Sequence, residues 1–156
     1  MDIFNPPLCL AKELKNSWST NLVTDLDPEK IPIEVAQGVP RLKMMHDTNS
    51  KDDWFACAIP LQSTWDPVDL SEFDALKFTL YIDEECGGVV RLEDDSGVES
   101  ADFELETMAP SPGEENTVTV ALGAFEMDEI NFKEIKLLKF IGYKGAAFYI
   151  SEICLE

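Results

Sequence analysis

The fold of this chain is most tightly constrained by short stretches in which apolar and polar residues alternate. The clearest is LKFTLYI at residues 76–82, where every second side chain is apolar and Lys77 and Thr79 lie between. A period of two is typical of a β-strand with one face on a core and the other toward solvent. The stretches VVRLED, DFELE and TVTVAL repeat this pattern, and turn signals such as DDSG separate them.

These stretches occur without any long segment of helical periodicity. Many short strands separated by turn signals predict an all-β chain built as a two-sheet antiparallel β-sandwich. The apolar positions of the alternating stretches should then face the space between the sheets. We expect the following side chains to be buried there: Phe78, Leu80, Leu92, Phe103, Val118 and Val120.

The length and composition of the chain are those of one globular domain. It has 156 residues, of which 45% are hydrophobic, so we expect a single domain over residues 1–156. No apolar run approaches the roughly 18 residues of a membrane helix. The N-terminal residues, with Asp2 and two early prolines, lack the basic region and apolar core of a secretory signal.

The chain is strongly acidic, with 31 acidic and 12 basic residues and a formal net charge of −19. Such a surface repels nucleic acid and anionic membranes, so we expect neither as a partner. It is compatible with neutral ligands such as polysaccharides, and solubility alone is the simplest explanation of the charge. Residues 83–106 hold ten acids and the single base Arg91, and we expect this segment to form a solvated face.

The four cysteines do not form a metal-binding or redox motif. Cys9, Cys57, Cys86 and Cys154 show no CxxC spacing, which excludes a zinc ribbon or a thioredoxin-like motif. We expect free thiols, with Cys57 and Cys154 inside strands as small apolar residues.

No catalytic residue is predicted. His46 is the only histidine, and none of the motifs of acyl hydrolases, zinc hydrolases or nucleotide-binding enzymes is present. A glycosidase needs only two carboxylates, and among 31 acids a pair can always be found, so this class is not discriminated. Residues 25–28 begin like a calcium loop of the EF-hand type but lack its third acid and its glycine, so no metal ligand is assigned.

The segment WFACAIPL at 54–61 has apolar residues on both faces. Its second face carries Ala56 and Ala58 after Trp54, so it is apolar but made of small side chains. A strand of this kind is either central in its sheet or lies beneath something flat.

Aromatic residues are the best candidates for a binding site, because aromatic faces stack on the C–H faces of sugar rings. Trp18, Trp54 and Trp65 are flanked by polar residues or turn signals, and Tyr81 and Arg91 face outward by the period of two. We predict that these five residues bind carbohydrate. The alternative is that each tryptophan closes one end of the sandwich and that Arg91 forms an ion pair within the acidic segment.

Three segments resemble the galactose-binding-like jelly roll: WDPVDLSEFDALKFTLYI, NTVTVALGAFE and FYISEICLE. Non-catalytic carbohydrate-binding modules of plant-cell-wall-degrading bacteria, including those of cellulosomal enzymes, use this fold. The resemblance implies a jelly-roll module that binds plant-cell-wall polysaccharide, with β-glucan first among the ligands, and that is not an enzyme itself. It further implies a monomer in an extracellular protein, covalently linked to a glycoside hydrolase that it targets to substrate.

The resemblance leaves two other functions and one cofactor open. Related sandwiches serve as protein-interaction domains, and some jelly rolls are glycan-active hydrolases. Sugar-binding jelly rolls often carry a structural calcium ion near the chain ends, where Glu152 would be a candidate ligand. Ser151, however, stands where the family often has an aspartate, and Tyr143 and Tyr149 are the next aromatics to consider for binding.

Overall fold

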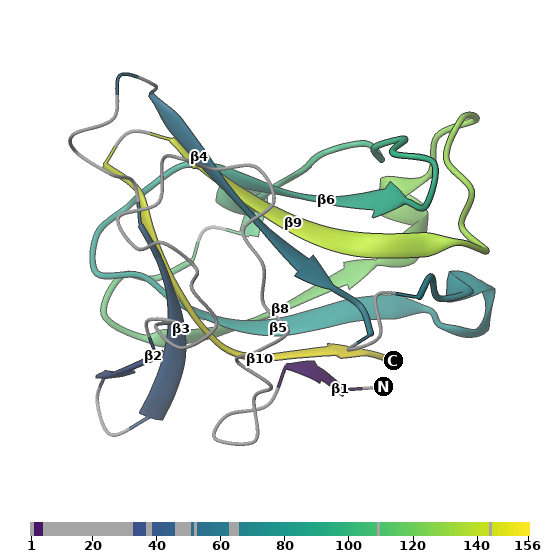
Figure 1. Cartoon of the computed structure of the whole chain (residues 1–156). Coiled ribbons are helices and arrows are strands. Elements are labelled where there is room, and N and C mark those ends of the chain that lie inside the picture. The colour runs from purple at the N-terminus through teal and green to yellow at the C-terminus, as the bar shows by residue number, and fades with distance from the viewer. Residues whose placement is uncertain are drawn as a thin grey trace.

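The chain folds into two antiparallel β-sheets that pack face to face, as a computed structural model shows (Figure 1). The two-sheet antiparallel β-sandwich predicted from the alternating stretches is therefore confirmed. The structure describes residues 2–4, 33–36, 39–45, 51, 53–62, 66–108, 110–143 and 145–156. Among them the only helices are short 3-10 segments, at Leu70–Glu72, Leu105–Met108 and Leu122–Phe125, and none has the length or apolar character needed to span a membrane.

The larger sheet has six strands. Its central strand β10 (Ala147–Leu155) pairs on one side with β5 (Ala75–Tyr81), which in turn pairs with the edge strand β8 (Glu115–Ala121). On its other side β10 pairs first with β3 (Val39–Met45) and near its end with β1 (Asp2–Phe4). The remaining strand, β2 (Ile33–Ala36), pairs with β3.

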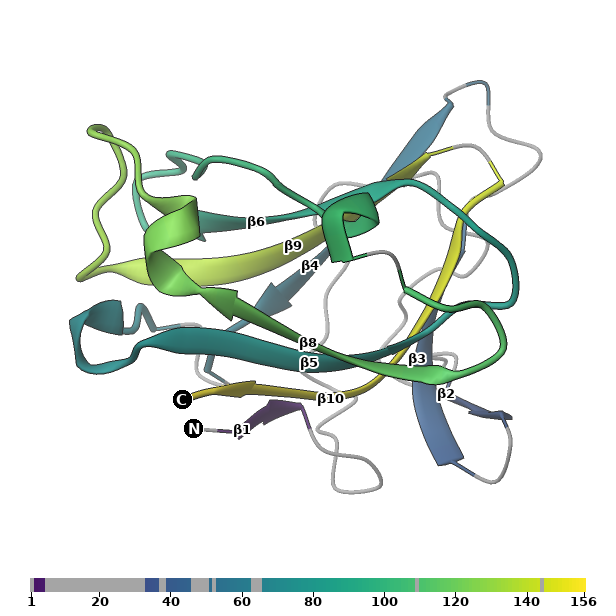
Figure 2. The same ribbon diagram turned by 180° about the vertical axis from the view of Figure 1, so that it is seen from behind.

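The smaller sheet has four strands in the order β4-β9-β6-β7. Its central strands are β9 (Ile135–Tyr143) and β6 (Gly88–Asp94), which lie between β4 (Trp54–Pro60) and the two-residue strand β7 (Phe103–Glu104). All of its strand pairs are antiparallel. Figure 2 shows this sheet lying over the larger one from the opposite side.

The core lies between the two sheets. Phe78 of the larger sheet and Phe140 of the smaller one meet edge to face, with ring centroids 5.3 Å apart. Five of the six side chains predicted for this space are at most 2% exposed, and Phe103 is half-buried against them. Cys57 also belongs to this core, as predicted.

Two glycines make room for aromatic rings at one end of the core. Gly88 and Gly142 are paired across β6 and β9, and both face inward. A Cβ built on Gly142 would lie 2.3 Å from Cε1 of Phe55, and one on Gly88 would lie 2.4 Å from Cζ of Phe148. The Phe55 and Phe148 rings, whose centroids are 5.8 Å apart, therefore occupy the space that side chains at these positions would need.

A buried carboxylate organises the turn after β6. Asp94 is 3% exposed, and its Oδ1 accepts hydrogen bonds from the N–H groups of Ser96 and Val98, each at 2.9 Å. Its Oδ2 accepts a bond of 3.0 Å from the N–H of Asn131. Burial by itself raises the pKa of Asp94, but these backbone donors outweigh it and lower the pKa. Gly97 takes the left-handed conformation of the predicted turn, at φ 84°.

Some local predictions are wrong. The alternation at residues 102–106 was expected to form a strand, but strand pairing ends at Glu104 and Leu105 begins a 3-10 helix. Cys154 lies in a strand and is buried, as expected, although it is paired with Lys77 on the outward side of the larger sheet rather than in the cluster between the sheets. The acidic segment 83–106 is not solvated throughout, because Glu93 and Asp94 are buried.

The first and last described strands lie side by side, because β1 pairs with the end of β10 (Figures 1 and 2). Glu156 continues this end of the sandwich and exchanges backbone hydrogen bonds with Ala75. The connection from β9 of the smaller sheet to β10 of the larger one lies at the opposite end of β10, where the Ala146 N–H donates to the Tyr143 carbonyl.

Candidate functional site

Two exposed aromatic side chains stand next to each other on the outward face of the smaller sheet. Trp54 of β4 is directly opposite Tyr143 of β9 in the strand register. Trp54 is 43% exposed and Tyr143 is 46% exposed, although both are large and apolar in most of their atoms. Opposite residues of an antiparallel pair have Cβ atoms about 4.5–5.5 Å apart, so the two rings form one aromatic patch.

The same face continues from this pair as a strip of apolar side chains. Ala56 lies opposite Ile141, and Val89 lies opposite Ile141 on the other side of β9. Ala56, Ala58 and Val89 are each at most 4% exposed. The alanines therefore do form a small second face of β4, as the sequence predicts.

A charge network follows the apolar strip. Arg91 and Lys139 are paired across β6 and β9. The Arg91 guanidinium donates from Nε to Asp102 Oδ1 at 2.8 Å, from Nη2 to Asp102 Oδ2 at 3.0 Å and from Nη1 to Glu99 Oε2 at 2.6 Å. Lys139, only 3% exposed, donates to Glu99 Oε1 at 2.7 Å and forms an ion pair with Glu93.

Glu99 joins the two cations of this network. Partial burial raises the pKa of Glu99, but the hydrogen bond and charge of Lys139, followed by the charge of Arg91, outweigh burial and lower it. For Arg91 partial burial lowers the pKa, but the hydrogen bonds that Arg91 donates to Asp102 and the charge of Glu99 outweigh burial, so the net shift is upward. Both shifts favour the charged forms, so the network stabilises the Glu99 carboxylate and the Arg91 guanidinium as ions.

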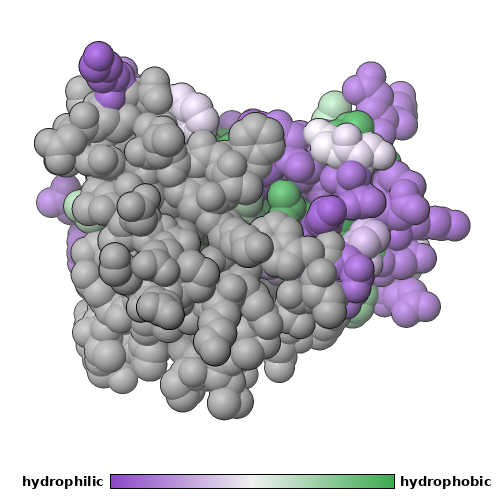
Figure 3. Space-filling view, viewed as in Figure 1, coloured by the Kyte–Doolittle hydropathy of each residue, from purple (hydrophilic) through white to green (hydrophobic). Residues whose placement is uncertain are grey.

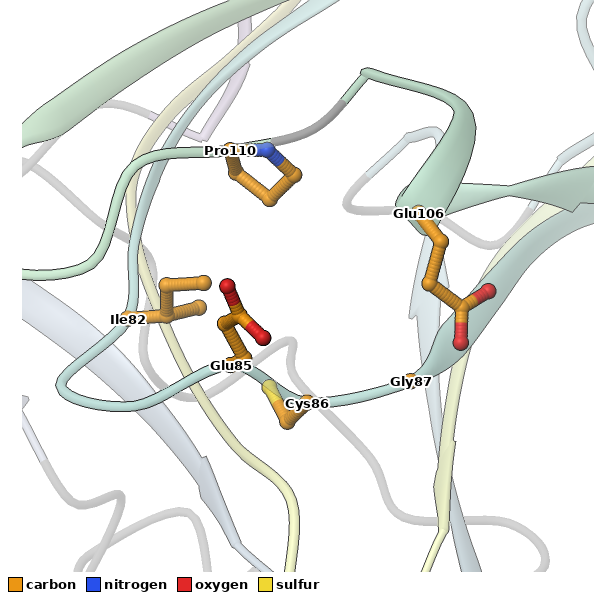
Figure 4. A pocket seen from close by; sticks show the side chains of 6 residues that line it. All are labelled: Ile82, Glu85, Cys86, Gly87, Glu106 and Pro110. Atoms are coloured by element: carbon orange, nitrogen blue, oxygen red, sulfur yellow. The ribbon is translucent and has the colours of Figure 1, made fainter.

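A pocket of about 430 Å³ lies at the end of the sandwich beside the aromatic pair. Figure 4 shows it between the loop that leaves β5 and the segment that follows the 3-10 helix at Leu105–Met108. Its described lining residues are Ile82, Glu85, Cys86, Gly87, Glu106 and Pro110. Cys86 is fixed by a 3.9 Å contact of its Sγ with the carbonyl of Ala147.

One wall of the pocket lies beside the Tyr143 ring. A Cβ built on Gly87 would lie 2.4 Å from Oε1 of Glu106 and 3.3 Å from Cδ2 of Tyr143. The Glu106 carboxylate and the Tyr143 ring thus approach the same backbone position, which has no side chain to separate them.

The rim of this end of the molecule is negative. Slight burial, followed by the charges of Glu106 and Asp102, raises the pKa of Glu104. Toward the opposite end of the sandwich, Figure 3 shows a described surface that is mostly hydrophilic, in keeping with the net charge of −19.

The structure brings together only some of the predicted site residues. Trp54 and Arg91 share the outward face of the smaller sheet, and Arg91 forms the ion pairs of the alternative interpretation. Tyr81 does face outward, but from the larger sheet, so the expected pairing with Arg91 in one site is wrong. Tyr81 is 8% exposed and meets Tyr149 edge to face at 5.8 Å. Trp18, Trp65 and the lone His46 lie outside the described residues.

Sequence reasoning did not assign Lys139 or the end pocket to a site. The alternation within IKLLKFIGY at 135–143 places Lys139 and Tyr143 on one face, and this signal could have linked them. Among the described residues no group of three or more His, Cys, Asp or Glu side chains is arranged to hold a metal ion.

Comparison with solved structures identifies the architecture, whereas no family model and no curated protein sequence matches the chain. The family 30 carbohydrate-binding module of a cellulosomal cellulase from Clostridium thermocellum superposes with a TM-score of 0.74 at 18% sequence identity. The match covers 99% of this chain and 95% of that one. The chain has the fold of these carbohydrate-binding modules.

The same fold recurs in two other settings. The family 11 carbohydrate-binding module from Clostridium thermocellum, in complex with a β-1,3-1,4-mixed-linked tetrasaccharide, has a TM-score of 0.55, 12% identity and 79% coverage of each chain. An exo-beta-agarase has a TM-score of 0.54 and 12% identity, and the match covers 75% of this chain and 20% of that one. The fold thus accounts for nearly all of the family 30 chain and for about a fifth of the agarase chain.

Proposed function

We propose that this chain is a non-catalytic module that binds plant-cell-wall polysaccharide, of the β-glucan type first, and targets an appended glycoside hydrolase to it. The observation that carries the proposal is the likeness to the family 30 module over nearly the whole of both chains. The family 11 neighbour with a bound mixed-linkage β-glucan tetrasaccharide favours the ligand class.

The Trp54–Tyr143 pair is the proposed contact with the polysaccharide. Each ring offers a flat apolar face to the C–H face of a sugar ring, and stacking removes apolar area from water. Loss of one such ring is expected to cost about 1–3 kcal/mol, which is about 5- to 150-fold in affinity. Trp18 and Trp65 are proposed as further stacking residues of the same ligand, on the sequence argument alone.

The charge network is proposed to hold the centre of this face rigid. The Arg91 side chain is 24% exposed and is held in place by Asp102 and Glu99, so its exposed part would meet sugar hydroxyl groups in a fixed position, whereas the apolar strip beside it is buried. The ion pairs of the network neutralise the charges of Lys139 and Arg91 locally. A neutral polysaccharide on this face would therefore meet no buried cation without a partner.

The positions of the chain ends suit a tethered module. β5 runs from Ala75, beside Glu156, to Tyr81 next to the pocket, a distance of about 20 Å for seven strand residues. A catalytic domain joined at either end would therefore leave the Trp54–Tyr143 patch accessible. Binding would raise the enzyme's effective concentration at its substrate, and the module would act as an extracellular monomer within the larger protein.

The test is affinity electrophoresis and titration calorimetry against mixed-linkage β-glucan, xylan, mannan and pectin, with an assay for new reducing ends. We expect binding to β-glucan without turnover. Trp54→Ala and Tyr143→Ala should each weaken binding about fivefold or more, whereas Tyr143→Phe, which keeps the ring, should bind nearly as well as the wild type. The binding of Trp18→Ala and Trp65→Ala would be measured in the same way.

Three outcomes would contradict the proposal. Release of reducing ends would make the chain a glycan-active hydrolase. Absence of binding to any polysaccharide would favour a protein-interaction domain. Unchanged glycan binding by all of the alanine variants, with unchanged melting temperatures, would place the site elsewhere on the molecule.

A further inference from the structure

We propose that the end pocket beside Tyr143 is a separate subsite that binds one further neutral sugar residue of the polysaccharide chain. The inference rests on the proposed function, because it takes the Trp54–Tyr143 patch as the place where the chain lies. It adds a second kind of contact, in which a sugar ring enters a pocket rather than stacking on a surface.

The first argument is proximity. The Glu106 carboxylate, which lines the pocket, and the Tyr143 ring both pack against the backbone of Gly87. These two side chains fill the space that a Cβ on Gly87 would need, so the pocket and the Tyr143 ring are separated only by the wall that Glu106 and Gly87 form. A linear chain stacked on Tyr143 would place its next sugar residue beside this wall, at the pocket.

The second argument is the size and shape of the pocket. Its volume of about 430 Å³ lies within the usual range of small-molecule sites, roughly 300–1,000 Å³. Figure 4 shows the Glu85 carboxylate directed between Ile82 and Pro110, with Glu106 on the facing segment. A ligand in the pocket would thus have polar groups on two sides and apolar carbon along one edge.

The third argument is chemistry. Carboxylate oxygens accept hydrogen bonds only, and the hydroxyl groups of a sugar are donors that suit them. Ile82 and Pro110 provide apolar contacts for the C–H groups of the same ring. No basic residue is among the described lining residues, and the nearby carboxylates are close enough to raise the pKa of Glu104. A uronic acid residue would therefore be repelled, and the ligand class is a neutral sugar.

The experiment measures how affinity grows with ligand length. Titration calorimetry would compare a neutral β-glucan tetrasaccharide with the corresponding hexasaccharide. The wild type should gain affinity on lengthening. Glu85→Gln and Glu106→Gln should each reduce that gain about three- to tenfold, since hydrogen bonds to charged acceptors are stronger than those to neutral ones. Glu126→Gln, an exposed acid outside the pocket lining, is the matched control and should keep the gain.

A second variant tests the wall beside Gly87 without changing the net charge. Gly87→Val would place a side chain where Glu106 Oε1 lies and against the Tyr143 ring, so it would displace the Glu106 carboxylate, and it should remove the gain on lengthening while the tetrasaccharide still binds. The melting temperature of Gly87→Val would be measured to confirm that this variant folds. If it does not fold, Glu85→Gln and Glu106→Gln decide whether the subsite exists.

The outcomes separate this inference from the proposed function. If the wild type binds neither oligosaccharide, the proposed function fails. If it binds both and the glutamine variants keep the full gain on lengthening, the subsite is refuted and the proposed function stands. Two results would overturn the ligand class. One is stronger binding of an oligogalacturonate than of the neutral hexasaccharide. The other is that the binding of an amino-sugar oligomer, and of no neutral oligosaccharide, depends on Glu85 and Glu106.

Discussion

Replacement of Lys139 by methionine should destabilise this protein far more than the replacement of an ordinary surface lysine. The Lys139 ammonium lies on the outward face of the smaller sheet but is nearly inaccessible, with a side-chain exposure of 3%. Its partners are Glu93, with a side-chain exposure of 11%, and the more exposed Glu99. Methionine keeps the length and apolar stem of the lysine and removes the charge.

The magnitude follows from what is left behind. Glu99 is 39% exposed and still pairs with Arg91, so it can keep its charge in contact with water. Glu93 has no such exposure and would remain as a buried carboxylate without its cation. Breaking a buried ion pair by removal of one partner costs about 3–5 kcal/mol, which is a large part of the 5–15 kcal/mol that stabilises a typical domain.

The control is another lysine of the same strand. Lys136 in β9 forms an ion pair of 2.6 Å with Asp95, but the two side chains are 33% and 46% exposed. An exposed pair contributes about 0–1 kcal/mol, so Lys136→Met should be nearly neutral. The double variant Lys139→Met/Glu93→Leu replaces the buried pair by apolar side chains and should recover most of the lost stability.

The assay is equilibrium unfolding in urea near neutral pH, followed by tryptophan fluorescence and far-ultraviolet circular dichroism. Equal midpoints for Lys139→Met and Lys136→Met would refute the reasoning, because the buried position would then carry no special cost. A double variant as unstable as Lys139→Met alone would also refute the reasoning. It would show that the lost stability comes from packing of the lysine stem and not from the Glu93 carboxylate left without its cation.

Three further predictions concern the sandwich itself. Gly142→Ala should lower the free energy of unfolding by about 1–3 kcal/mol, because its Cβ would overlap the Phe55 ring. The control is Gly123→Ala, where a Cβ meets no atom within 4 Å, and it should leave the urea midpoint nearly unchanged. Folding lowers the pKa of Asp94. Its carboxylate therefore stabilises the fold at pH values above about 3.9, the pKa of an aspartate in the unfolded chain. This stabilisation is lost as the pH falls through the lower pKa of Asp94 in the folded protein. Asp94→Asn should therefore be destabilising at neutral pH, and the difference from wild type should shrink in acid urea titrations. Burial raises the pKa of Cys57 to about 12, so iodoacetamide should label it only after unfolding, and rapid native labelling would contradict its place in the core.

The strands and the faces of their side chains could be predicted from the sequence, because the period of two is a local property of the backbone. The apolar positions of 76–82 face the core, and β9 occupies the predicted residues 135–143. The local rule failed at Leu105, where a 3-10 turn replaces the strand because β7 pairs with β6 only through Phe103 and Glu104.

The composition of the site was decided by tertiary structure. Alternation states that Tyr81 and Arg91 face outward, but it does not state from which sheet, since sheet membership depends on hydrogen bonds between segments far apart in the chain. Those long-range pairings put Tyr81 against Tyr149 on the larger sheet and set Arg91 beside Lys139 on the smaller one.

The aromatic patch and the pocket have the same origin. The exposed position of Trp54 at the start of a strand was visible in the sequence, but its partner Tyr143 is supplied by the register between β4 and β9. The pocket requires two loops to meet at one end of the sandwich, and no local pattern specifies that meeting. The sequence by itself therefore determined the fold class and the outward-facing candidates, while the pairing of strands decided which of them form one site.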